Sequence, residues 1–175
     1  GLDLLSLAES MAGTLPSLLF KFLMSQYQNV TTDNRDDCKQ AETIIKTIST
    51  TASERTVDEN LLMIFLSFAK IGVTIAAHAD NDDFDGSPDG GWDACTNDAA
   101  NFPEASVREV GTGLGIALTS LSAISGSSSI GGDQLDSFTD GCADLAALNP
   151  LLDFCSVTDA SSFTADQVKG IRSIV

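Results

Sequence analysis

TVDENLLMIFLSFAKIGVTIAAHA, residues 56–79, is the most hydrophobic segment of the chain. Thr56 and Glu59 have the spacing of a capping box, in which each side chain accepts a hydrogen bond from the backbone of the other, so a helix is expected over 57–79. The apolar part of this helix is barely long enough to cross a membrane, and Lys70 near its centre is costly in lipid. The segment is therefore predicted to be the buried central helix of a bundle.

Helical periodicity also dominates the rest of the chain, where clear strand alternation is hard to find. The leucine-rich first segment is interrupted at Pro16, so we expect one kinked helix or two short helices there. Capping boxes that begin at Ser106 and Thr164 predict two later helices. The expected helices cover residues 2–28, 36–52, 57–79, 106–124, 134–148 and 164–175.

These segments predict an all-α fold in a single domain over residues 1–175, with a bundle of six to seven helices and one long Asp-rich loop over residues 80–98. The helix pairs are similar in size to the helical hairpins of tetratricopeptide repeats, so such an arrangement is expected by analogy. Gly111, Gly115 and Thr119 lie four residues apart and give one helix a face of small residues. This face and the first helix are either docking surfaces or part of the domain's own core.

The composition excludes several functions. The 175 residues include 25 acidic and 9 basic side chains, for a formal net charge of −16, and 43% of them are hydrophobic. A chain this acidic repels phosphate backbones, so we expect no binding to nucleic acid. The single histidine, His78, excludes a histidine-rich metal site and leaves one residue for serine or cysteine catalysis. We expect no enzyme activity, and we interpret His78 as a helix-terminal residue whose charge suits the helix dipole.

Four cysteines are scattered along the chain, and none of them forms a C-x-x-C pair. Four-cysteine zinc sites normally contain such close pairs, so two disulfides in an oxidising compartment are the favoured interpretation. The alternative is four buried free thiols in a cytosolic protein. Of the three possible connectivities we favour Cys142–Cys155, whose cysteines flank a predicted turn, together with Cys38–Cys95.

The segment HADNDDFDGSPDGGWDAC, residues 78–95, is rich in aspartate. Asn81, Asp83 and Asp85 stand at alternate positions, and Gly86 allows the backbone to turn sharply after them. Calcium takes about six to eight oxygen ligands, which short side chains on a turning loop supply. The alternative is a solvated acidic loop that holds no specific metal.

This pattern resembles the D-x-D-x-D-G-x-x-D calcium loops of thrombospondin type 3 repeats, and its first half resembles EF-hand and dockerin loops. It departs from the EF-hand at the twelfth loop position, where Trp92 replaces a bidentate glutamate. The resemblance implies one calcium ion, with these residues as ligands and the last of them in reserve: Asn81, Asp83, Asp85, Asp89 and Asp93.

The whole chain resembles small helical, cysteine-containing lipoproteins and secreted proteins of the bacterial envelope. The resemblance rests on the leucine-rich first helix and on the segments WDAC (92–95), VGTGL (110–114) and FTAD (163–166). It implies export to the periplasm, the outer membrane or the extracellular space. The start at Gly1 without methionine is expected of a processed chain, and an upstream lipidated cysteine would provide a membrane anchor.

We therefore expect a non-enzymatic structural or interaction subunit of a cell-envelope or extracellular assembly, stabilised by calcium and by disulfides, with another protein as its partner. The alternative function is the binding of an apolar small molecule or lipid between the leucine- and phenylalanine-rich helices.

Overall fold

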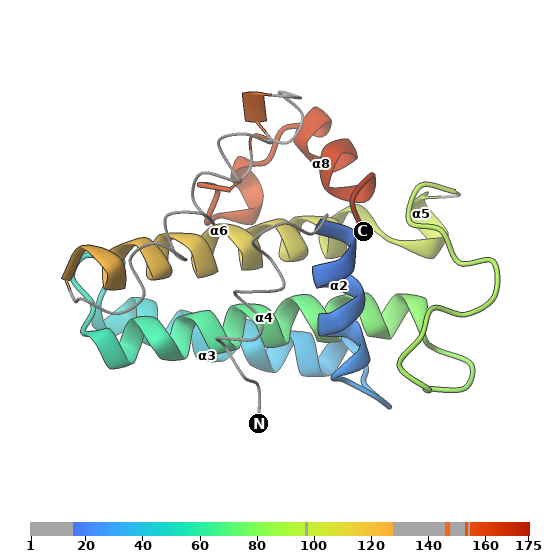
Figure 1. Cartoon of the computed structure of the whole chain (residues 1–175), viewed down its shortest axis with the longest axis horizontal. Coiled ribbons are helices and arrows are strands. Elements are labelled where there is room, and N and C mark those ends of the chain that lie inside the picture. The colour runs from blue at the N-terminus through green and yellow to red at the C-terminus, as the bar shows by residue number, and fades with distance from the viewer. Residues whose placement is uncertain (1–15, 97, 128–145, 148–152, 154) are drawn as a thin grey trace.

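In the computed structural model, the described residues are 16–96, 98–127, 146–147, 153 and 155–175, and this part of the chain is helical with no strand (Figure 1). The elements found there are α2 (Pro16–Ser25), α3 (Thr32–Ile48), α4 (Val57–Ala79), the short α5 (Asp98–Asn101), α6 (Glu104–Ser127), the 3-10 helix η2 (Ala160–Ser162) and α8 (Ala165–Arg172). The all-α prediction is thus confirmed. The helix expected over 134–148 and the start of the first helix lie outside the described residues, so the count of six to seven helices and the hairpin-repeat arrangement stay predictions.

α4 is the central helix, and α2, α3 and α6 all pack against it. It begins where the sequence predicts, because the Glu59 N–H donates to Thr56 Oγ1 at 3.2 Å and the Thr56 N–H donates to Glu59 Oε2 at 2.7 Å. By length and composition alone α4 could cross a membrane, yet 61% of its most apolar window is buried inside the molecule. The neighbouring helices cover α4 as they would the core helix of a bundle.

The main hydrophobic core joins α2, α4, α6 and α8. Leu23 of α2, Ile71 of α4, Val110 of α6 and Ile171 of α8 are fully buried in it. Figure 1 shows α3, α4 and α6 lying alongside one another, with α8 and η2 on the side of α6 that faces away from α4. The core is therefore built from helix-to-helix contacts on several sides of α4 and α6.

The small-residue face of α6 belongs to the protein's own core. A Cβ at Gly111 would lie 2.5 Å from the ring of Phe163, and a Cβ at Gly115 would overlap the carbonyl oxygen of Val157. No side chain fits into either gap, so the segment 157–163 lies directly on α6. The alternative of a docking surface at these two glycines is excluded.

α3 begins at Thr32, four residues earlier than predicted. Thr31 caps the helix, because its hydroxyl accepts from the Asp33 N–H at 3.3 Å while its own N–H donates to Asn34 Oδ1 at 2.9 Å. The polar residues just before the predicted start at residue 36 are thus the capped first turn of the helix.

The two later capping boxes have different outcomes. α6 begins at Glu104 rather than at Ser106, and the Ser106 hydroxyl contacts the side chains of His78 and Arg35 instead of capping the helix. The box at Thr164 is confirmed, because the Thr164 side chain and the third residue of α8 bond each other's backbone.

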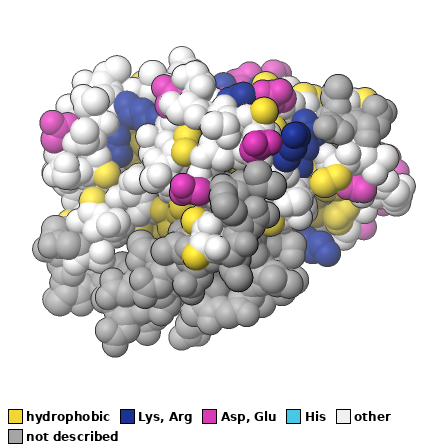
Figure 2. All heavy atoms as spheres, turned by 90° about the horizontal axis from the view of Figure 1, so that it is seen from above, with side chains coloured by type: hydrophobic (Ala, Val, Ile, Leu, Met, Phe, Trp, Pro, Cys, Tyr) yellow, Lys and Arg dark blue, Asp and Glu magenta, His cyan; other side chains and the backbone are white. Residues whose placement is uncertain are grey.

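Exposed apolar side chains are concentrated on α3 and α4. Ile45 of α3 and Met63 of α4 share one buried cluster with Ile116 of α6, whereas four other large apolar side chains of α3 and α4 are exposed. We call these exposed side chains the apolar strip: Ile44, Ile48, Leu62 and Phe65. Seen from the side of α8, in contrast, the described surface is mostly neither hydrophobic nor charged (Figure 2).

Candidate metal centre

The Asp-rich loop begins where α4 ends. Asp80 follows the helix directly and is only 2% exposed. Its carboxylate accepts hydrogen bonds from the N–H groups of Asp85 at 3.2 Å and Gly86 at 2.8 Å. Gly86 has a φ of +86°, a left-handed conformation that glycine adopts without strain. The buried carboxylate of Asp80 therefore folds the loop back onto the end of α4.

Asp89 makes a second set of hydrogen bonds that holds the loop against the end of α4. Its N–H donates to the Ala79 carbonyl at 2.6 Å, and its Oδ2 accepts from the Asn81 N–H at 3.0 Å. Residues 80–89 contain five aspartates and no basic residue. The closed loop consequently brings carboxylates together with no lysine or arginine of its own to balance them.

These carboxylates form two groups that share Asp83. One group contains Asp80, Asp83 and Asp85, the other contains Asp82, Asp83 and Asp89, and within each group the ligand oxygens lie within 4.8 Å of one another. Carboxylates at this distance repel one another unless a proton or a cation lies between them. A set of ligands made only of oxygen fits a hard divalent cation such as calcium.

The pKa shifts in the second group reflect this crowding. A hydrogen bond with Asp89 raises the pKa of Asp82, and desolvation and the charges of Asp89 and Asp83 add to the effect. The pKa of Asp89 is lowered, first by the backbone N–H of Asn81 and then by Asp82. Asp82 therefore holds a proton more readily than an isolated aspartate does, and a bound cation would take the place of that proton.

The predicted ligands are only partly brought together. Asp83, Asp85 and Asp89 belong to the two groups. Asn81 lies in the same loop, but its side-chain nitrogen donates to the His78 carbonyl at 3.1 Å. The Asn81 amide is thus engaged at the end of α4.

Asp93 lies outside both groups, and its carboxylate accepts from the Cys95 N–H at 2.8 Å and from the Thr96 hydroxyl at 2.7 Å. Sequence reasoning missed Asp80 and Asp82, which the two groups include. The position of Asp80 in the sequence could have indicated its role. It follows the last apolar residue of the helix directly, where an aspartate side chain readily accepts hydrogen bonds from the backbone that follows.

The predicted disulfide between Cys38 and Cys95 is wrong, because both are free thiols. Cys38 lies on α3, where burial raises the pKa of its thiol, whereas Cys95 Sγ lies 3.6 Å from the carbonyl oxygen of Arg172 on α8. The two cysteines therefore contact different parts of the fold. Cys155 is disulfide-bonded, but Cys142 lies outside the described residues, so the Cys142–Cys155 pairing stays a prediction.

His78 lies in the last turn of α4, as predicted, but its environment does not favour its charge. Nε2 of His78 lies 2.8 Å from Oγ of Ser106, and Phe102 packs edge-on at a centroid distance of 5.4 Å. Burial and then the nearby charge of Arg35 lower the pKa of His78. Ser106 is 2% exposed, so this serine–histidine contact does not present an accessible nucleophile.

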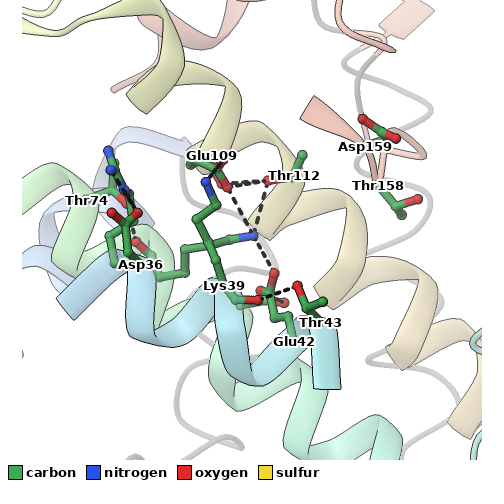
Figure 3. Close-up of polar contacts among 12 residues, drawn as sticks. Asp36, Lys39, Glu42, Thr43, Thr74, Glu109, Thr112, Thr158 and Asp159 are labelled. Carbon is green, nitrogen blue, oxygen red and sulfur yellow. Dashed lines mark hydrogen bonds and ion pairs between the residues drawn. The ribbon is translucent and has the colours of Figure 1, made fainter. Parts of the chain in front are cut away.

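A buried ion cluster on the facing sides of α3, α4 and α6 was not predicted. Lys70 is 1% exposed, and its Nζ lies 2.7 Å from Glu42 Oε2, 3.2 Å from Thr112 Oγ1 and 3.7 Å from Glu109 Oε2 (Figure 3). Lys39 completes the cluster at 2.7 Å from Glu109 Oε1. Two carboxylates and two ammonium groups balance one another, so the cluster needs no external ion.

The cluster also explains why the capping box predicted at Ser106 is not formed. That box requires the side chain of Glu109, three residues after Ser106, but Glu109 pairs with Lys39 and Lys70 instead. The sequence could have predicted a buried ion pair at Glu42. This residue falls on the same helix face as Cys38 and Ile45, where a buried charge needs a partner of opposite charge.

Comparisons with protein-family models, with curated proteins and with solved structures gave no match to this chain.

Proposed function

We propose that this chain is a non-enzymatic structural or interaction subunit of a bacterial cell-envelope or extracellular assembly, in which one calcium ion orders the Asp-rich loop. The observation that carries the proposal is the sharing of Asp83 by two groups of carboxylates. A divalent cation at this point would offset part of the negative charge of a loop that has no base, and it would link the carboxylates of Asp80 and Asp89 that hold the loop to the end of α4. Export and an upstream lipid anchor are part of the same proposal and rest on the resemblance to envelope proteins.

The apolar strip supports a protein partner. Ile44 is 56% exposed and Ile48 is 70% exposed, four residues apart on the same helix. Leu62 and Phe65 are exposed on α4, the helix against which α3 packs. Four exposed large apolar side chains on two packed helices favour an interaction surface. The binding of an apolar small molecule or lipid has less support, because the apolar side chains of α2, α4 and α6 pack against one another.

Thermal unfolding of the non-reduced protein with calcium, and then with a chelator, tests the metal centre. Calcium at about a hundred times its dissociation constant stabilises the folded state by roughly 2.7 kcal/mol, which is about 5–10 °C in melting temperature for a chain of this size. We expect this shift in the wild type and its loss in Asp83→Asn, because Asp83 belongs to both groups.

The matched control is Asp93→Asn, which removes the same charge from an aspartate outside the two groups. This variant is expected to keep the calcium-dependent shift. An equal loss in both variants would show that calcium only screens the acidic loop. The absence of any shift in the wild type would leave residues 80–89 a plain acidic loop.

A further inference from the structure

A cleft of about 480 Å³ lies at the other end of α4 from the Asp-rich loop. Its walls are the connection between α3 and α4, one side of α6, and the segment 156–158. Among the described residues that line it, hydroxyl side chains predominate, with two basic side chains and no acidic one. The residues used below are Lys46, Arg55, Ser122, Ser156 and Thr158.

Lys46 reaches the cleft from the last turn of α3. Its ammonium has one hydrogen bond, to the Thr158 carbonyl at 3.5 Å, and no carboxylate within 4.0 Å in the described part of the chain. Burial lowers the pKa of Lys46, as do the charges of Lys70 and Arg55, although Glu42 and Asp159 act in the opposite direction. A half-buried ammonium with so few partners gains from an anion that contacts it directly.

Arg55 lies at the other end of the connection between α3 and α4, just before α4 begins. Its Nε donates to the Ser49 carbonyl at 3.2 Å and its Nη2 donates to the Thr50 carbonyl at 3.1 Å. These bonds hold the guanidinium in place, and among the described residues no carboxylate lies within 4.0 Å of it. Arg55 is thus a fixed positive charge beside the cleft.

The two bases of the cleft stand out in so acidic a chain. The chain has 25 acidic residues and only 9 basic ones. Five bases form ion pairs within the described part of the chain, namely Arg35, Lys39, Lys70, Arg108 and Lys169. Lys46 and Arg55 form no ion pair with a described residue, and both line the same hydroxyl-rich cleft.

We propose that the cleft binds a small hydroxylated oxyanion, of the class of acidic sugars, with the oxyanion at Lys46 and Arg55 and the sugar hydroxyls at Ser122 and Ser156. Two cations provide charge-assisted hydrogen bonds to a carboxylate or a phosphate. Serine hydroxyls donate and accept, which is the pattern that sugar hydroxyls require. The volume of the cleft is in the range of small-molecule sites.

Isothermal titration calorimetry of the full chain with glucuronate, glucose 6-phosphate, inorganic phosphate and glucose tests the proposal. We expect at least one of the two acidic sugars to bind and neutral glucose to bind far more weakly. Glucuronate binding assigns a carboxylate ligand, and glucose 6-phosphate binding assigns a phosphate. The proposal is overturned if neither acidic sugar binds at millimolar concentration, or if glucose binds equally well.

Two variants locate the site. Lys46→Met is expected to weaken binding of the acidic sugar about tenfold or more, the loss of one charged hydrogen bond, and Lys21→Met on α2 is expected to leave it unchanged. Ser122→Ala, on an exposed position of α6, should weaken the acidic sugar but not inorganic phosphate. Circular dichroism checks that each variant is folded. Unchanged affinity in both Lys46→Met and Ser122→Ala would place binding elsewhere and overturn the assignment.

Discussion

Lys70 is a fully buried charge whose partners come from two other helices. Glu42 of α3 and Glu109 of α6 both reach its ammonium, and the Thr112 hydroxyl adds a third contact. Removing such charges from water costs several kcal/mol per ion, and the mutual attraction offsets that cost only while every partner is present. The cluster therefore adds little net stability, but it strongly favours the one packing of α3, α4 and α6 that pairs all its members.

Lys70→Met is expected to lower the free energy of unfolding by about 3–5 kcal/mol, because Glu42 is left buried without its ammonium partner. Lys39→Met is the control, since the Lys39 side chain is 42% exposed and its ion pair is worth about 1 kcal/mol or less. Urea unfolding measures both. The double variant Lys70→Met with Glu42→Leu should recover much of the loss, and equal losses in the two single variants would contradict the cluster.

At the scale of elements, glycines decide how closely other segments approach the long helices. A Cβ at Gly113 of α6 would lie 2.6 Å from the side chain of Ile71 on α4. On another side of α6, the segment that leads into α8 packs against Gly111 and Gly115. Glycine lowers helix propensity by about 1 kcal/mol relative to alanine, and here the close packing offsets that loss.

Gly115→Ala is expected to destabilise the protein by about 1–3 kcal/mol, because the new methyl group would meet the Val157 backbone, which can move away only with its whole segment. Gly90→Ala is the matched control, since a Cβ there meets nothing within 4 Å and should change stability by less than about 0.5 kcal/mol. Denaturant unfolding of the two variants compares them. Equal effects would show that the segment 157–163 does not lie on α6.

At the scale of the whole molecule, the stability of the fold at mildly acidic pH depends on His78, which is the only histidine of the chain. His78 is held neutral in the folded protein, because burial and the charge of Arg35 lower its pKa below the ordinary 6.5. The unfolded chain therefore takes up a proton at His78 before the folded chain does. The stability that depends on neutral His78 is complete above about pH 6.5 and is lost as the pH falls toward the lowered folded pKa.

Stability of the wild type is thus expected to fall as the pH drops from neutral to below about 6.5, and His78→Gln should flatten this part of the profile. The carboxylates of the Asp-rich loop are present in both proteins, so the difference between the two profiles isolates His78. Thermal unfolding across this range is the measurement. Parallel profiles would contradict the assignment of a lowered pKa.

Several features follow from the sequence because they depend on residues a few positions apart. The bounds of α4, the capping boxes at Thr56 and Thr164, and the turn at Gly86 all rest on local hydrogen bonds and local backbone preference. The gathering of aspartates in one loop is equally local, which is why Asp83 and its neighbours could be named in advance. Asp80 and Asp82 come close to the other carboxylates only because the loop folds back onto the end of α4, so the spacing of residues in the sequence did not predict them as ligands.

By itself, then, the sequence determined the helical class, the central helix, its ends and the acidic loop, since local hydrogen bonding and apolar periodicity suffice for these. Only the tertiary structure decided that Lys70 pairs with Glu42, 28 positions away, that Val157 covers Gly115, and that Cys38 and Cys95 stay apart. The physical reason is that such contacts depend on which helix faces meet when the apolar surfaces are buried, and many pairings of faces satisfy the same one-dimensional pattern.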